Sequence, residues 1–179
     1  MINDDHCLGN LVDAVRAALR QGACWANTAD LVAEQLKGNL PGAGLLTGRQ
    51  RAGDPAGYCT HLLHVEPDGA FSVVALVWRP GQATPIHDHV TWCVTGVIQG
   101  TEREERYLLR DDGCLAEGEV VMNPAGAVAG LAPPGDIHCV RNAGHEVAIS
   151  VHVYGTDVSR LGSSVRRVYD LPVIAAARA

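Results

Sequence analysis

The chain has 179 residues, of which 47% are hydrophobic and 19% charged, so it can bury a core of one-domain size. Twenty acidic and fourteen basic side chains leave a net charge of −6, which argues against nucleic acid or an anionic membrane surface as the main partner. No apolar run reaches the roughly 18 residues that a membrane helix needs, and the acidic first residues do not read as a secretory signal.

The cysteines indicate a reducing compartment. There are six of them, scattered without any C-x-x-C pair. This distribution argues against a disulfide framework and against a structural zinc site built on thiolates. We therefore expect a cytoplasmic protein.

The first third of the chain predicts helices. Apolar residues recur at helical spacing in Leu8–Leu19, with Asn10 as a candidate N-cap. A second segment, from Thr28 to Leu36, carries a similar stripe. We expect residues 1–56 to form a helical segment that packs on the remainder, residues 57–179, within a single domain overall.

From Gly57 onward the pattern changes to short strands separated by glycine- and proline-rich turns. Many short strands at regular spacing are typical of a small barrel or sandwich. The charged run Glu102–Arg106 is interpreted as the solvated face of one strand. The seven predicted strands are Cys59–Val65, Phe71–Trp78, Trp92–Gln99, Glu102–Leu109, Glu119–Met122, His138–Arg141 and Val147–Tyr154.

The strongest local feature is His87-Asp88-His89. Residues two apart on a strand point to the same face, so the two imidazoles would converge on one point. That geometry suits a divalent transition metal. An isolated H-x-H also arises by accident in cores and on surfaces, so the surrounding residues decide its meaning.

Those surroundings resemble the two motifs of the cupin superfamily. Gly81, His87-x-His89, Cys93 and Gly100 follow the spacing of the first motif, and Pro133-Pro134-Gly135, His138 and Asn142 follow that of the second. The resemblance implies an all-β core, a cupin double-stranded β-helix barrel, with N-terminal α-helices. It also implies that His87, His89 and His138 are the metal ligands.

The match departs from the cupin pattern at two positions. The glycine that opens the second motif, Gly126, is displaced by one residue, and Cys93 stands where many cupins have an acidic ligand. Without that carboxylate, three neutral imidazoles would leave Fe(II) its full charge and open coordination positions. Cys93 as a fourth ligand, and Cys93 as a packing residue, remain open alternatives.

A further group of residues narrows the family. Ser150, His152 and Tyr154 alternate along one strand and share a face, which in isolation could simply meet solvent. Beside three histidines they resemble the Ser-His-Tyr triad of thiol dioxygenases. The stretches FSVVALVWRPGQATPIHDH, GDIHCVRN and SVHVYG together resemble bacterial cysteine dioxygenases and 3-mercaptopropionate dioxygenases, between Tyr58 and Asp170.

This resemblance implies a non-heme Fe(II) enzyme that adds both atoms of O2 to the sulfur of a small thiol, giving a sulfinic acid. Tyr154 would donate a hydrogen bond at the open face of the site, with His152 and Ser150 orienting its hydroxyl. The partners would be the thiol and O2, with no nucleic acid and no membrane, in a monomer or small homo-oligomer. Cys93 lies near the position of a cysteine that forms a thioether with the tyrosine in vertebrate relatives, so a Cys93–Tyr154 cross-link is a further expectation.

Substrate contacts are less clear from the resemblance. Relatives have arginine or glutamine where this chain has Thr60, and a shift of one residue would offer His61. The segment Arg166-Arg167-Val168-Tyr169-Asp170 resembles one in mercaptopropionate enzymes, where an arginine reaches the substrate carboxylate, so a thiol carboxylate such as 3-mercaptopropionate or cysteine is expected. Arg166 and Arg167 could equally form a surface basic pair, and Trp92 could form a pocket wall or pack in the core.

Two other classes of function remain open from the sequence. One is a different metal-dependent cupin enzyme, such as a dioxygenase of a non-thiol substrate or an isomerase. The other is a non-catalytic cupin that binds a small ligand.

Overall fold

The N-terminal part of the computed structural model, which describes residues 4–21 and 24–175, is helical. Its helices are α1 (Asp4–Leu19), α2 (Trp25–Asn39), the short 3-10 helix η1 (Ala43–Leu45) and α3 (Gly48–Arg51). Asn10 lies inside α1, so its prediction as a cap is wrong. The apolar periodicity begins at Leu8, and it could not reveal that the helix extends a further turn through polar residues.

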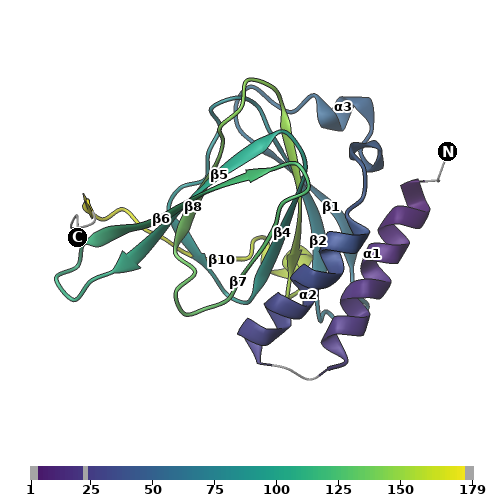
Figure 1. The fold of residues 1–179 in the computed structure, drawn as a ribbon, viewed down its shortest axis with the longest axis horizontal. Helices are drawn as coiled ribbons and strands as arrows, with labels where there is room; N and C mark the ends of the chain where they lie inside the picture. The colour runs from purple at the N-terminus through teal and green to yellow at the C-terminus, as the bar shows by residue number, and fades with distance from the viewer. Residues whose placement is uncertain (1–3, 22–23, 176–179) are drawn as a thin grey trace.

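The rest of the chain forms two curved sheets that close into a barrel (Figure 1). The five-stranded sheet has the order β1 (Cys59–Val65), β2 (Ser72–Trp78), β9 (Ala148–Tyr154), β4 (Cys93–Gln99) and β7 (Val128–Leu131). The six-stranded sheet has the order β10 (Val165–Val168), β3 (His87–His89), β8 (His138–Asn142), β5 (Thr101–Leu109), β6 (Leu115–Pro124) and β11 (Val173–Ile174). A short helix, α4 (Val158–Leu161), precedes β10. The predicted cupin barrel with N-terminal helices is confirmed.

All seven predicted strands are present, with ends that differ by a few residues. The seven ranges leave out β3, β7, β10 and β11, which are four residues long or shorter, although the H-x-H motif itself predicts a strand at His87–His89. β7 contains Gly130, and β10 carries Arg166 and Arg167 in adjacent positions. Neither segment shows the alternation of apolar and polar residues that identifies a half-buried strand.

Helix α2 lies on the outer face of the five-stranded sheet, against β4 and β7, and α1 packs beside α2 (Figure 1). Leu11, Val15 and Leu36 from the helices share one buried cluster with Val151 and Val153 of β9. Because side chains alternate along a strand, the intervening residues of β9 point the other way, into the barrel. The helices thus determine which face of β9 is available for chemistry.

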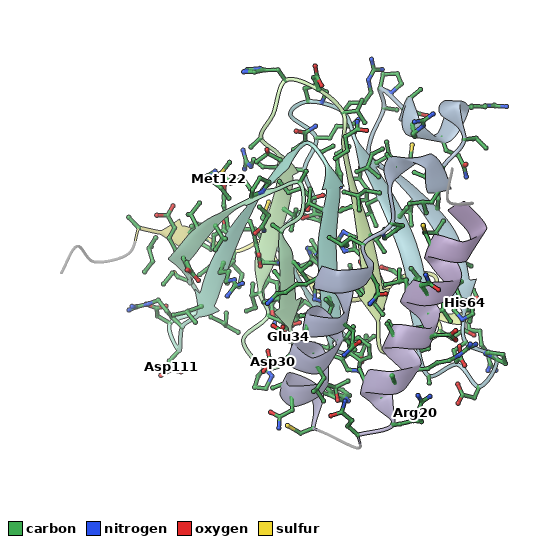
Figure 2. All side chains as sticks on the ribbon, turned by 45° about the vertical axis from the view of Figure 1, so that its right-hand side comes forward. Arg20, Asp30, Glu34, His64, Asp111 and Met122 are labelled. Atoms are coloured by element: carbon green, nitrogen blue, oxygen red, sulfur yellow. The ribbon has the colours of Figure 1, made fainter. Side chains whose placement is uncertain are left out.

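Charged side chains cover the outside of the molecule. In Figure 2 the labelled Arg20 directly follows α1, Asp30 and Glu34 lie on α2, and Asp111 and Met122 mark the arm formed by β5 and β6; all five residues are exposed. Within the described ranges, no helix is both long enough and apolar enough to cross a bilayer. The division at residue 56 and the oligomeric state stay predictions.

The interpretation of Glu102–Arg106 as a solvated face is wrong for two of its residues. Glu102 is only 1% exposed and Glu104 only 3%. β5 lies between β8 and β6, so one of its faces points into the barrel, and these two carboxyl groups lie on that face. Buried carboxylates need partners, and the ones found here belong to the candidate site.

Candidate metal centre

Three buried imidazoles meet inside the barrel. His87 and His89 come from β3, and His138 comes from β8, where it is the register partner of His87. The ring centroids lie 4.7 to 5.1 Å apart. One ligand nitrogen from each ring falls within 4.8 Å of the others, so the three residues predicted as ligands do gather at one point.

Each of the two β3 imidazoles is oriented by a hydrogen bond at its Nδ1 atom. His87 Nδ1–H donates to the carbonyl oxygen of Pro85 at 3.0 Å. His89 Nδ1–H donates to Asp136 Oδ2 at 3.1 Å, and the same oxygen accepts the His89 backbone N–H at 2.8 Å. Because both acceptors require a proton on Nδ1, the lone pair of each ring lies on Nε2.

The third imidazole is oriented in the same way. His138 Nδ1–H donates to Glu104 Oε1 at 3.1 Å, and Arg106 Nε donates to that oxygen at 3.2 Å. Burial alone would raise the pKa of Glu104, but these two partners outweigh it and lower the pKa to about 2. Among the described residues His138 Nε2 is buried without a hydrogen-bond partner, as a lone pair reserved for a metal ion would be.

The protonation state of the cluster favours metal binding. Burial, reinforced by the neighbouring imidazoles, lowers the pKa of His87 to about 3. Burial also lowers the pKa of His138, although Glu104 acts in the opposite direction. Neutral imidazoles are the form that ligates metals, so at neutral pH these residues need not lose a proton to bind one. Three imidazole nitrogens suit a first-row transition metal such as iron(II).

Asp88, between the two β3 histidines, points to the opposite side of the strand. Its Oδ2 accepts a hydrogen bond from Tyr169 Oη at 2.8 Å and is paired with the guanidinium of Arg166. Arg167 lies over the Tyr169 ring, 4.5 Å from its centroid. Both arginines are therefore engaged outside the barrel, which corrects the expectation that one of them grips the substrate.

A hydrogen-bonded line runs along the inner face of β9. Tyr154 Oη lies 3.2 Å from His152 Nδ1, and Ser150 Oγ lies 3.0 Å from His152 Nε2. All three side chains are buried. The Tyr154 ring also lies 6.0 Å from the ring of His89, centroid to centroid, so the predicted triad does stand beside the three imidazoles.

The line continues to Glu102, which the sequence analysis did not connect with the site. Its carboxyl group lies against the Ser150 hydroxyl and the Trp78 indole. Burial raises the pKa of Glu102 to about 7 despite these two hydrogen-bond donors, and the nearby charge of Glu104 adds to the rise. Ser150 also accepts a hydrogen bond from Trp78 Nε1 at 3.3 Å.

Cys93 lies opposite Tyr154 rather than among the metal ligands. The two residues are register partners of β4 and β9. The Cys93 thiol is 4.0 Å from His152 Nδ1, and burial raises its pKa to about 12. The donor atoms that gather in the described part of the chain come from histidines only, so the alternative of Cys93 as a fourth ligand is wrong for this structure. The cross-link to Tyr154 stays a prediction.

A cavity of about 200 Å³ opens beside the three imidazoles. Thr60 and Tyr154 line it, whereas His61 lies on the opposite face of β1. Trp92 lies in the core cluster beneath the helices, so its expectation as a pocket wall is wrong. Gly155 allows this packing, because a Cβ atom there would stand 2.2 Å from Trp92 Nε1.

The two carboxylates that bond to Nδ1 of His89 and His138 were not predicted from the sequence. Asp136 stands two residues before His138, and Glu104 shares its strand face with Glu102. The one sequence signal that could have identified Glu104 is the alternation of residues along a strand, which also predicted that His87 and His89 share a face. It could show which residues share a face but not which face is buried.

Comparison with known proteins places the chain in a family. The model of the family described as "Cysteine dioxygenase type I" matches residues 49–163, more than half of the chain. Among solved structures, an oxalate oxidase in complex with glycolate is 20% identical with a TM-score of 0.47; the match covers 58% of this chain and about half, 53%, of the other.

Two bacterial structures are similar at a comparable level. An RmlC-like cupin protein from Desulfovibrio desulfuricans is 22% identical, with a TM-score of 0.43 and coverage of 57% of this chain and 86% of the other. A double-stranded β-helix protein from Klebsiella pneumoniae is 25% identical, with a TM-score of 0.47 and coverage of 58% and 76%. The family match and the three-histidine cluster agree, and the chain belongs to the cysteine dioxygenase type I family.

Proposed function

We propose that the protein is an iron(II)-dependent thiol dioxygenase that converts a small thiol and O2 to a sulfinic acid. The reaction balances as RSH + O2 → RSO2H, with no leaving group. The observation that carries the proposal is the convergence of the Nε2 atoms of three imidazoles beside the hydrogen-bonded line of Ser150, His152 and Tyr154. The Nδ1 atom of each imidazole is engaged in a hydrogen bond on its other side. His87, His89 and His138 would hold the iron, which supplies the redox chemistry that joins oxygen to sulfur.

The role of the cavity is to hold the thiol next to this centre. Its walls include Val74, Leu76 and Val140 together with the three imidazoles. An apolar wall excludes water and strengthens the hydrogen bonds made inside it. A buried site of this kind protects a reactive thiol from side reactions while it is oriented.

Tyr154 is the group that donates a proton or a hydrogen bond to the reacting atoms. Burial raises the pKa of its phenol well above the usual value, so the hydroxyl keeps its proton at neutral pH. Its direction depends on His152 Nδ1, which lies 3.2 Å from Tyr154 Oη and 3.1 Å from Thr95 Oγ1. A proton on Nδ1 that is donated to the Tyr154 oxygen would leave the Tyr154 O–H to donate to Ser164 or into the cavity.

The protonation state of Glu102, next to Ser150, would decide the direction of the hydrogen bonds that lead to Tyr154. Glu102 Oε1 is buried without a hydrogen-bond partner among the described residues, so a protonated Glu102 would have the Ser150 oxygen beside it to donate to, and Ser150 would then donate to His152 Nε2. The His152 proton consequently sits on Nδ1, where it donates to Tyr154. An ionised Glu102 accepts from Ser150 and reverses each bond. Trp78 Nε1 donates to Ser150 in either arrangement, so it does not decide between them.

The proposal is tested with protein purified without oxygen and loaded with iron(II). Oxygen uptake is measured with a panel of thiols, and the products are identified by mass spectrometry. We expect consumption of one O2 per thiol and a product that has gained two oxygen atoms. Failure of every thiol in the panel to stimulate oxygen uptake would contradict the proposal.

A further inference from the structure

The cavity beside the three imidazoles has two kinds of wall. One is aliphatic and is formed by Val74, Leu76, Val140, Val158 and Val165. The other presents hydroxyl groups and is formed by Tyr58, Thr60, Thr84, Ser163 and Ser164, of which Ser164 is buried. Aliphatic walls favour a ligand with an apolar body, and hydroxyl groups can both donate to and accept from a neutral polar group.

The two arginines of β10, which follow the cavity-lining Val165, have other partners. Arg166 is paired with Asp88, and its Nε donates to Asp88 Oδ2 at 3.1 Å. Arg167 is the register partner of Asp88 on β10 and lies over the ring of Tyr169. Asp88 points away from the imidazoles because it alternates with His87 and His89. The carboxylate of Asp88 therefore holds the guanidinium group of Arg166 on the outer side of the barrel.

A carboxylate that entered this cavity would exchange water for methyl and hydroxyl groups. The hydroxyls could return some hydrogen bonds, but no lysine or arginine lines the described cavity, and the charge of an iron(II) ion held by the imidazoles would be offset in part by the thiolate of the substrate itself. Burial of an ionised carboxylate is costly unless a cation compensates it. An amide or alcohol of the same size would enter with a much smaller loss of hydration.

We propose that the substrate is an uncharged thiol, with a short aliphatic body and a neutral polar group, rather than a thiol carboxylate. This inference rests on the proposed thiol oxidation. The apolar body would lie against Val74, Leu76 and Val140, and the polar group would meet the hydroxyls of Thr60 and Ser164. The volume of about 200 Å³ is small beside the roughly 300–1,000 Å³ of pockets for drug-sized ligands, so the thiol is small.

The test uses 3-mercaptopropionate and 3-mercaptopropionamide, which have nearly the same shape and differ in charge. Binding to the iron(II)-loaded protein is measured by calorimetry without oxygen, and kcat/KM is measured separately from oxygen uptake. We expect the amide to bind at least about tenfold more tightly and to be oxidised with a higher kcat/KM. Equal or tighter binding of the carboxylate would overturn the inference.

The two measurements separate this inference from the proposed function. Tighter binding of the amide without any oxygen uptake would support the ligand class and contradict thiol oxidation. Oxidation of both thiols with preference for the carboxylate would support thiol oxidation and contradict the proposed class of substrate.

Variants of the cavity wall provide a second test. Thr60→Arg would place a cation in the wall, and we expect it to shift the ratio of the two binding constants toward the carboxylate by about tenfold. Met122→Arg adds the same charge on the exposed face of β6, away from the cavity, and should leave the ratio unchanged. Arg167→Ala should also leave it unchanged, and selective loss of carboxylate binding in that variant would overturn the inference. If Thr60→Arg does not fold, the comparison of the two thiols in the unmodified protein still decides.

Discussion

Cys93 and Tyr154 face each other across β4 and β9, on the inner side of the barrel. Both belong to one buried cluster, and the Cys93 thiol is also within 4.0 Å of the histidine that orients the tyrosine. Directly opposed residues of an antiparallel pair have Cβ atoms about 4.5–5.5 Å apart, within reach of a thiol and an aromatic ring.

We expect turnover to join Cys93 and Tyr154 through a thioether, with O2 as the oxidant that takes up the two hydrogen atoms lost. Tryptic mass spectrometry should then find the two peptides linked, with a mass two hydrogens below their sum. Cys93→Ala should abolish the linked species and leave a metal-binding protein. Peptides that stay separate after many turnovers would identify Cys93 as a packing residue.

Glu104→Gln is expected to weaken metal binding by about 10- to 100-fold, since it removes the charge that orients and polarises His138. Competition with a chromophoric chelator measures this affinity directly. Glu105→Gln is the matched control, because Glu105 is the next residue of β5 and bonds instead to Tyr107 Oη at 2.8 Å. Equal affinities in the two variants would remove the role assigned to Glu104.

Tyr154→Phe should reduce kcat by about 100-fold, in the range found for a positioned proton donor, and leave iron content unchanged. The phenol touches the cavity but is not one of the three gathered ligands. Steady-state oxygen uptake gives kcat, and metal analysis gives the occupancy. His152→Ala should produce a similar loss through Tyr154, while a fall in iron content would instead assign these residues to metal retention.

Glu102→Gln should stabilise the metal-free fold at alkaline pH. Burial raises the pKa of Glu102 to about 7 in the folded state, from its ordinary value of about 4.5. The contribution of Glu102 to the free energy of unfolding is therefore complete below its unfolded-state pKa of about 4.5, and it is lost as the pH rises to about 7. Removing the ionisable group should recover up to roughly 3 kcal/mol at pH 8 and nothing at pH 4.

Urea denaturation of both proteins across this pH range measures the difference in the free energy of unfolding. The growth of this difference from pH 4 to pH 8 matters more than its size, because a general packing defect would appear equally at both values. A variant that is less stable at both values would contradict the assignment of Glu102 as a carboxyl group with a raised pKa.

The sequence by itself determined the features that depend on strand alternation and short spacing. His87 and His89 share a face because they are two residues apart, and the same reasoning placed Ser150, His152 and Tyr154 together. Turn residues separated seven strands correctly. The spacing around His138 linked it to the other histidines through the family resemblance.

The tertiary structure alone decided which face of each strand is inside. Glu102 and Glu104 read as solvent-exposed, yet both are buried, because their face of β5 points into the barrel. Trp92 packs beneath the helices rather than lining the cavity. A strand pattern specifies two faces, but their assignment depends on the sheets and helices that pack on them, and those contacts join residues far apart in the chain.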